Sequence, residues 1–240
     1  MAVSRTMIEI VGCGPGAADY LTGAARKAVL GAELLAGSRR LVELFPDYRG
    51  EKLLVDAHIE PLLDQLEAAW RLGRKVAVLV SGDPGLYSLA ERLLRRFGRE
   101  NCRVTPAVSS VQTAFARLGL SWDNVRVISV HGRLPPGDVD LSQRDKLALL
   151  CGTREAMCWA ASTCEALRET HAAYLCENLT LPGERVCRLT PEDLRAYRGA
   201  GVPPAQAAET AAPQQPGVDP GQPLGTASLA ILVLVRRETW

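Results

Sequence analysis

The chain has 240 residues, and 47% of them are hydrophobic, which is enough to bury the cores of two modest α/β domains. Its 28 basic and 27 acidic residues nearly cancel, so no nucleic-acid partner is expected, because such partners favour a basic face. The seven cysteines are scattered without a CxxC pair and there are only three histidines, so we expect a cytoplasmic protein with no metal site. Because the chain has no long apolar run, we also expect no signal peptide and no membrane span.

Short apolar runs alternate with helical stretches through the first half of the chain. This rhythm predicts a parallel sheet with helices on both faces. The clearest helix is Ile59–Leu72, with Pro61 in its first turn and Gly73 at its end. The expected strands are residues 7–12, 32–36, 52–55, 75–80 and 102–105.

The stretch Gly119–Asn124 breaks this rhythm and predicts a boundary between two α/β domains, residues 1–119 and 120–240. In the second domain we expect a helix near 154–168 and a short helix capped by Thr190. The aliphatic run Ala227–Val235 is expected to be the central strand of the second sheet. The other expected strands are residues 125–130, 146–150, 171–176 and 185–189.

Residues 199–225 are rich in Pro, Ala, Gln and Gly and hold almost no large apolar side chain. Such a segment buries too little surface to offset the entropy of ordering. We therefore expect a flexible insert before the last strand of the second domain.

The loop Ser81–Gly85, with the sequence SGDPG, follows the buried strand at 76–80. Gly82 and Gly85 carry no Cβ, so a ligand can approach the backbone closely. Asp83 places a carboxylate at the carboxyl end of a strand, where open α/β sheets bind ligands. The alternative is a tight turn in which Asp83 only caps a helix.

A second glycine loop, GCGPG, follows the first strand at residues 12–16. It lacks the GxGxxG spacing of dinucleotide-binding loops, and the second strand ends in Ala-Gly without the acidic residue that binds a ribose. Pro15 stands where the opening helical turn would offer N–H groups to a pyrophosphate. The pattern therefore disfavours a nicotinamide or flavin cofactor.

These two loops, together with PAVSSVQTAFA at Pro106–Ala116, resemble the tetrapyrrole methyltransferases. ISVHGR, LLCGT and CENLTLPGERV, which begin at Ile128, Leu149 and Cys176, resemble the cobalamin-pathway branch that methylates carbon 5 of precorrin-7 or cobalt-precorrin-7. The resemblance runs from about Met7 to Arg237. It implies an S-adenosylmethionine-dependent enzyme with two α/β domains and an active site in the cleft between them.

The resemblance also implies a set of cofactor-binding residues. Gly82, Asp83 and Leu86 would contact S-adenosylmethionine through their loop, and Ser109 and Ser110 would meet its methionine part. Cys151 and Tyr174 would flank the adenosine, and Pro15 would lie near the methyl group. Simpler structural roles stay open: Ser109 fits a helix cap, Cys151 a buried strand end, and Pro15 a loop-shaping residue.

The implied substrate is a flat macrocycle with several carboxylates, which arginine forks bind well. The candidate substrate-binding residues are Arg39, Arg40, His131 and Arg133, although Arg39 and Arg40 also fit a solvated charge pair. Glu177 follows a strand directly and would either accept a proton from the macrocycle or cap a turn.

The chain resembles a stand-alone subunit of the pathway, so we expect a separate decarboxylating carbon-15 methyltransferase as partner, and a homodimer. Two alternatives remain open. In the first, the chain is another tetrapyrrole methyltransferase of the same fold. In the second, it is a nucleotide-binding module without catalysis.

Overall fold

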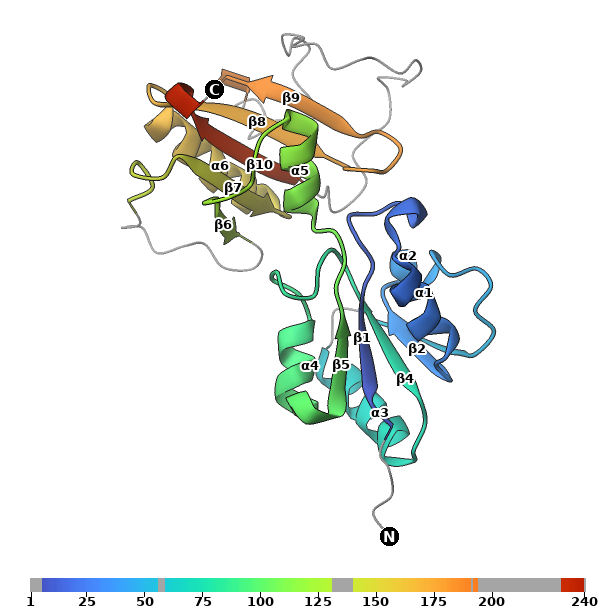
Figure 1. Cartoon of the computed structure of the whole chain (residues 1–240). Helices are drawn as coiled ribbons and strands as arrows, with labels where there is room; N and C mark the ends of the chain where they lie inside the picture. Colours follow the sequence, from blue (N-terminus) through green and yellow to red (C-terminus); the bar gives the residue numbers. More distant parts are fainter. Residues whose placement is uncertain (1–5, 56–58, 131–139, 191, 194–229, 240) are drawn as a thin grey trace. The chain divides into compact units, whose positions relative to one another are not determined.

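Two five-stranded sheets organise the chain, one in each of two α/β units (Figure 1). The computed structural model describes residues 6–55, 59–130, 140–190, 192–193 and 230–239. Its contacts group the chain into Met1–Ser110 and Val111–Trp240, so helix α5 (Ser110–Leu118) falls almost wholly in the second unit. The boundary that the sequence predicts, between residues 119 and 120, would put α5 in the first. The insert expected at 199–225 lies outside the described residues.

The first sheet is parallel throughout and has the strand order β3-β2-β4-β1-β5. Each strand lies within two residues of its predicted position, so periodicity alone located this sheet. The central strands were easiest to find, because a strand buried on both faces reads as an unbroken apolar run. The bounds are β1 Ile8–Gly12, β2 Leu34–Gly37, β3 Glu51–Leu54, β4 Val76–Val80 and β5 Cys102–Thr105.

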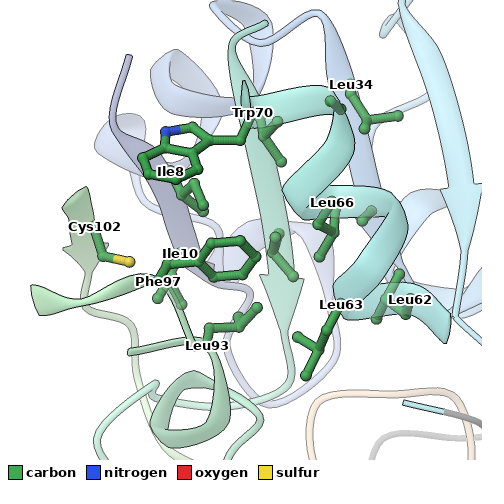
Figure 2. Close-up of a cluster of buried hydrophobic side chains, with 14 of the residues drawn as sticks. Ile8, Ile10, Leu34, Leu62, Leu63, Leu66, Trp70, Leu93, Phe97 and Cys102 are labelled. Carbon is green, nitrogen blue, oxygen red and sulfur yellow. The ribbon is translucent and has the colours of Figure 1, made fainter. Parts of the chain in front are cut away.

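Helices cover both faces of this sheet, as predicted. Helices α3 (Ile59–Arg71) and α4 (Ala90–Phe97) pack on one face, where Leu66 and Trp70 meet Ile8 and Ile10 of β1 (Figure 2). The rings of Trp70 and Phe97 meet edge to face, with their centroids 5.9 Å apart. Helices α1 (Gly23–Leu30) and α2 (Arg39–Val42) contribute to a second buried cluster with β1, β2 and β4.

The second sheet is mixed and has the order β6-β7-β10-β8-β9. Strands β6 and β7 are parallel, and the remaining pairs are antiparallel. The aliphatic last strand lies between β7 and β8, which confirms its predicted central position. The bounds are β6 Arg126–Ser129, β7 Lys146–Cys151, β8 His171–Glu177, β9 Arg185–Leu189 and β10 Ala230–Arg236.

Helix α6 (Arg154–Leu167) packs on one face of the second sheet, against Leu149, Leu175 and Leu232. Thr153 caps this helix by accepting a hydrogen bond from the Ala156 N–H, 3.1 Å away. The side chains that alternate with this set point to the opposite face, and Val233 among them is fully buried. In Figure 1, α5 lies on the side of the sheet opposite α6.

The short helix predicted after β9 begins with its cap in place. Thr190 Oγ1 accepts a hydrogen bond from the Asp193 N–H, and Asp193 Oδ2 accepts one from the Thr190 N–H, 2.8 Å away. This reciprocal pair is the arrangement of a capping box, with Asp in the place of Glu or Gln. The short 3-10 turn η3 (Arg237–Thr239) follows β10.

The last residue of β1, Gly12, sets how closely the loops beyond the sheet approach one another. A Cβ on Gly12 would lie 2.7 Å from Pro84 Cδ and 2.8 Å from Ala107 Cβ. Strand β1 lies between β4 and β5, so the loops that follow those two strands meet over the end of β1 only because this side chain is missing.

We predict that Gly12→Ala lowers the free energy of unfolding by about 1–3 kcal/mol, the usual cost of overpacking a well-filled site. The matched control is Gly23→Ala, because a Cβ on Gly23 meets nothing within 4 Å and Gly23 is the first residue of α1. That variant should be neutral or slightly stabilising. Urea unfolding of both variants measures the difference, and equal stabilities would show that the loops do not depend on Gly12.

Candidate active site

Three loops gather at the carboxyl edge of the first sheet, because strands β4, β1 and β5 are neighbours in a parallel sheet. The loop after β1 holds Pro15, the loop after β4 holds Gly82 and Asp83, and the loop after β5 holds Ser109. Helix α2, with Arg39 and Arg40, follows the adjacent strand β2. The fold therefore brings every predicted site residue of the first unit to one edge, the edge at which open α/β sheets bind ligands.

The loops after β1 and β4 are joined backbone to backbone. The Gly82 N–H donates to the Gly14 oxygen at 2.9 Å, and the Gly14 N–H donates to the Gly82 oxygen at 3.3 Å. Both glycines are left-handed, with φ of +74° at Gly14 and +64° at Gly82. A residue with a Cβ pays a conformational cost in this region, so the pairing depends on glycine at both positions.

The carboxylate of Asp83 joins the loops after β4 and β5. Oδ1 accepts a hydrogen bond from the Gly85 N–H at 2.8 Å, and Oδ2 accepts one from the Ala107 N–H at 3.0 Å. Asp83 therefore closes its own turn and also pins a loop 24 residues further along. The interpretation of Asp83 as a helix cap is wrong, because α4 begins only at Ala90 and it is Ser88 Oγ that accepts the Ala90 N–H.

Open space lies beside Gly82, since a Cβ built there meets no atom of the described residues within 4 Å. Leu86, in the same loop, is partly exposed. Pro15 is buried, Ser109 is 5% exposed at the position before α5, and Ser110 opens that helix. The backbone at Gly82 is thus accessible, whereas Pro15 and Ser109 lie deeper.

The two adjacent arginines of α2 differ in their surroundings. Arg39 is exposed, whereas Arg40 is partly buried and its Nη2 donates to Ser81 Oγ at 3.2 Å. Burial lowers the pKa of Arg40, and the nearby thiol of Cys13 opposes that shift in part. The interpretation of both residues as one solvated pair therefore fits Arg39 only.

In the second unit, Cys151 and Glu177 lie in one row of the sheet. Cys151 pairs with Ala230 of β10, and Ala230 pairs with Glu177 on its other side. Tyr174 pairs with Val233, three residues further along β10, which is a distance of about 10 Å. Cys151 points into the cluster beneath α6, whereas Tyr174 alternates with Leu175 of that cluster and faces the other side. The structure does not bring Cys151 and Tyr174 together.

Glu177 is buried and ion-paired. Its Oε2 accepts hydrogen bonds from Nε and Nη2 of Arg185, at 2.9 and 2.5 Å. Arg185 opens β9 directly opposite Glu177 in the register of the two strands. This pair closes the base of the β8–β9 hairpin, and the sequence did not identify Arg185 as the partner of Glu177.

The β8–β9 loop, residues 178–184, has a strained backbone that the sequence did not reveal. Asn178, Thr180 and Gly183 have φ of +49°, +68° and +81°. A left-handed conformation is a true outlier for a β-branched residue such as Thr180 and costs roughly 1–3 kcal/mol. Glu184 holds the loop in this shape, because Oε2 accepts the Thr180 N–H and Oε1 accepts Nε of Arg117 on α5, each at 2.5 Å.

Two predicted substrate-binding residues, His131 and Arg133, lie outside the described residues. Within the described ranges, no group of three or more His, Cys, Asp or Glu side chains is placed to hold a metal ion. Over the same ranges, no helix has both the length and the apolar character needed to cross a membrane.

An all-parallel sheet with glycine loops at its carboxyl edge, followed by a mixed five-stranded sheet, defines a two-unit α/β protein. Residues 7–195 match the model of the tetrapyrrole (corrin/porphyrin) methylases. The chain belongs to this family and is a methyltransferase, which confirms the resemblance seen in the sequence.

Relatives agree with this assignment. The chain is 34% identical to the cobalt-precorrin-7 C(5)-methyltransferase of Salmonella typhimurium, over 75% of this chain and 89% of that protein. It is 30% identical to the precorrin-6Y C(5,15)-methyltransferase (decarboxylating) of a Sinorhizobium species, over 55% of this chain and 32% of that protein. The structure of the precorrin-6Y methylase of Archaeoglobus fulgidus superposes with a TM-score of 0.63 at 25% identity, covering 96% of this chain and 98% of that one.

We predict that Glu184→Gln destabilises the protein by about 1–3 kcal/mol at pH 7, because a charged acceptor of three hydrogen bonds is lost. Burial opposes ionisation of Glu184, but the bonds from Arg117 and Thr180 outweigh it and hold the pKa of this carboxyl below its ordinary 4.5. The stabilisation is therefore present above pH 4.5 and is lost as the pH falls through the lower pKa of the folded state.

Urea unfolding at pH 7 and at about pH 3 measures this effect. The control is Glu169→Gln, whose exposed pair with Arg168 should contribute little at either pH. A Glu184→Gln deficit that is as large in acid as at neutral pH would exclude this explanation.

Proposed function

We propose that the chain is an S-adenosylmethionine-dependent C-methyltransferase of cobalamin biosynthesis that methylates carbon 5 of precorrin-7 or cobalt-precorrin-7. The pathway and the position of the methyl group are supported by the 34% identical relative, which this chain covers over 89% of its length. The observation that carries the cofactor is the open, left-handed Gly82 in a loop that Gly14 and Asp83 lock to its neighbours.

The residues at this edge fit the cofactor. Because no Cβ occupies the space beside Gly82, a ligand can lie directly against the backbone there. Leu86 offers an apolar surface in the same loop, and Ser109 and Ser110 would receive the methionine part at the β5 end. Asp83 would act mainly through the backbone that it holds, since both of its carboxylate oxygens accept N–H groups of the protein.

Methyl transfer requires the protein to position the cofactor and the substrate, and it requires no covalent nucleophile from the protein. When bound, S-adenosylmethionine supplies a methyl group made electrophilic by its sulfonium. The locked loops would hold that end of the site still and keep water out, so that a carbon nucleophile can approach to about 3–3.5 Å. Glu177 is proposed as acceptor of the proton that the macrocycle loses, with Arg185 holding its carboxylate in place. Cys151 and Tyr174 remain proposed adenosine contacts, and Pro15 remains proposed near the methyl group.

Two statements about assembly belong to the same proposal. A separate decarboxylating carbon-15 methyltransferase is proposed as partner of this chain, because the name of the Sinorhizobium relative joins methylation at carbon 5 with methylation at carbon 15. A homodimer is also proposed. Anionic tetrapyrroles are the proposed substrate class, with Arg40, His131 and Arg133 as the proposed basic residues.

Mass spectrometry of the reaction tests the function. Precorrin-7, or its cobalt form, is incubated with the protein and S-adenosylmethionine carrying a ¹³C-labelled methyl group. A gain of one methyl, located at carbon 5 by carbon NMR, is the expected result. Methylation at another position would identify a different tetrapyrrole methyltransferase, and cofactor binding without any turnover would indicate a non-catalytic module.

We predict that Gly82→Ala weakens S-adenosylhomocysteine binding at least tenfold, since the new Cβ enters the space proposed for the cofactor. The matched control is Gly73→Ala. Gly73 is also left-handed, with φ of +78°, and a Cβ there also meets nothing within 4 Å, but it follows α3 at the other end of β4. Both variants should lose about 1–2 kcal/mol of stability from strain, and only Gly82→Ala should lose affinity.

Isothermal titration calorimetry with S-adenosylhomocysteine and with NAD measures the affinities. NAD should not bind, because GCGPG lacks the dinucleotide spacing and the second strand has no terminal acid. Equal affinities of Gly82→Ala and Gly73→Ala for S-adenosylhomocysteine would place the cofactor elsewhere.

A further inference from the structure

Arg40 differs from Arg74 and Arg96 of the first unit in its electrostatic partners. Arg74 pairs with Glu51, and Arg96 pairs with Asp64 and Glu67. No carboxylate of the described residues pairs with Arg40, and its Nη1 is buried with no hydrogen-bond partner among them. A buried guanidinium is costly unless its charge is paired, so this position favours binding of an anion.

The thiol of Cys13, which interacts electrostatically with Arg40, does not supply that anion. Burial raises the pKa of the Cys13 thiol to about 12, and the charge of Arg40 lowers it only in part. The thiol therefore stays neutral at physiological pH. The remaining contact of the guanidinium is Ser81 Oγ, which accepts from Nη2 and orients the group next to Gly82. Nη1 is buried and has no partner among the described residues, so the charge of the group is left for an anion, and a guanidinium suits a carboxylate.

The position of Arg40 in the sheet distinguishes two sources of a carboxylate. The methionine part of the cofactor, with its own carboxylate, is proposed at Ser109 and Ser110 beyond β5. Arg40 follows β2, and the order β2-β4-β1-β5 puts three strand spacings, about 14 Å, between those two ends. The carboxylate at Arg40 therefore comes from the other ligand.

We propose that Arg40, oriented by Ser81, binds a carboxylate side chain of the tetrapyrrole substrate beside the cofactor loop, and that the exposed Arg39 does not. This inference rests on the proposed function for its substrate class. It goes further by separating the two adjacent arginines and by naming the hydroxyl that orients one of them.

Direct binding tests this proposal without turnover. The probe is uroporphyrin I, a tetrapyrrole with eight carboxylates, titrated by fluorescence into the protein saturated with S-adenosylhomocysteine. Arg40→Met should weaken uroporphyrin binding about ten- to a hundredfold, the effect of losing a charged hydrogen bond. Arg40→Lys should recover part of the loss, because it keeps the charge but not the fork. The matched control, Arg39→Met, should change the affinity less than threefold.

Two further readouts separate binding from folding. Arg40→Met should melt at the same temperature as the wild type or higher, because it removes an unpaired buried charge, and its affinity for S-adenosylhomocysteine should stay within twofold. Ser81→Ala should leave the fold intact and weaken uroporphyrin binding by a smaller factor than Arg40→Met, which keeps the proposal testable if Arg40→Met does not fold.

Several results would overturn the proposal. These are an unchanged uroporphyrin affinity in Arg40→Met, an equal loss in Arg39→Met, a loss confined to S-adenosylhomocysteine, or no saturable uroporphyrin binding by the wild type. Failure of the proposed function is distinguishable from these, because wild-type protein that binds uroporphyrin through Arg40 but does not methylate precorrin-7 would contradict only the reaction.

Discussion

The carboxylate of Asp83 is the constraint on which the loop edge of the first sheet depends. One oxygen closes the turn that contains Gly82, and the other reaches across the end of β1 to the Ala107 N–H. That reach is short enough only because Gly12 has no side chain between the two loops. The paired glycines Gly14 and Gly82 add the third connection. These connections fix the shape of the backbone at this edge of the sheet. A ligand that binds through main-chain atoms requires such a fixed shape.

The residues at this edge of the first sheet are of two kinds. Gly12, Gly14 and Asp83 hold the loops together by contacts within the protein, and their substitution should first affect stability. Gly82 and Arg40 carry free space or unpaired charge at the same edge, and their substitution should first affect binding. An unpaired guanidinium costs stability in the absence of ligand, a cost that proteins tend to concentrate at functional sites.

The order of elements in both units follows from local periodicity, which is why the sequence located the strands within a few residues. The hydrogen bonds between loops could not be predicted from local periodicity, because they join residues that are far apart in the chain. Nothing in SGDPG shows that Asp83 bonds to Ala107 instead of capping α4. The placement of Cys151 and Tyr174 on opposite faces was also hidden, since the strand HAAYLCE is largely buried on both sides and shows no alternation. The resemblance supplied roles for those two residues, but the faces on which they lie come only from the fold.

The β8–β9 loop gives the clearest case of strain held in place by tertiary contacts. Three left-handed residues within six positions would relax in an isolated hairpin, and Thr180 would relax most, because its branched Cβ is least tolerant of that conformation. Glu184 prevents this by bonding to the Thr180 N–H and to Arg117, and the Glu177–Arg185 pair closes the hairpin below. The loop lies within CENLTLPGERV, one of the three motifs through which the sequence resembles the carbon-5 branch. A shape that tertiary contacts maintain against its own backbone preference is better explained by a need to present that shape than by packing alone.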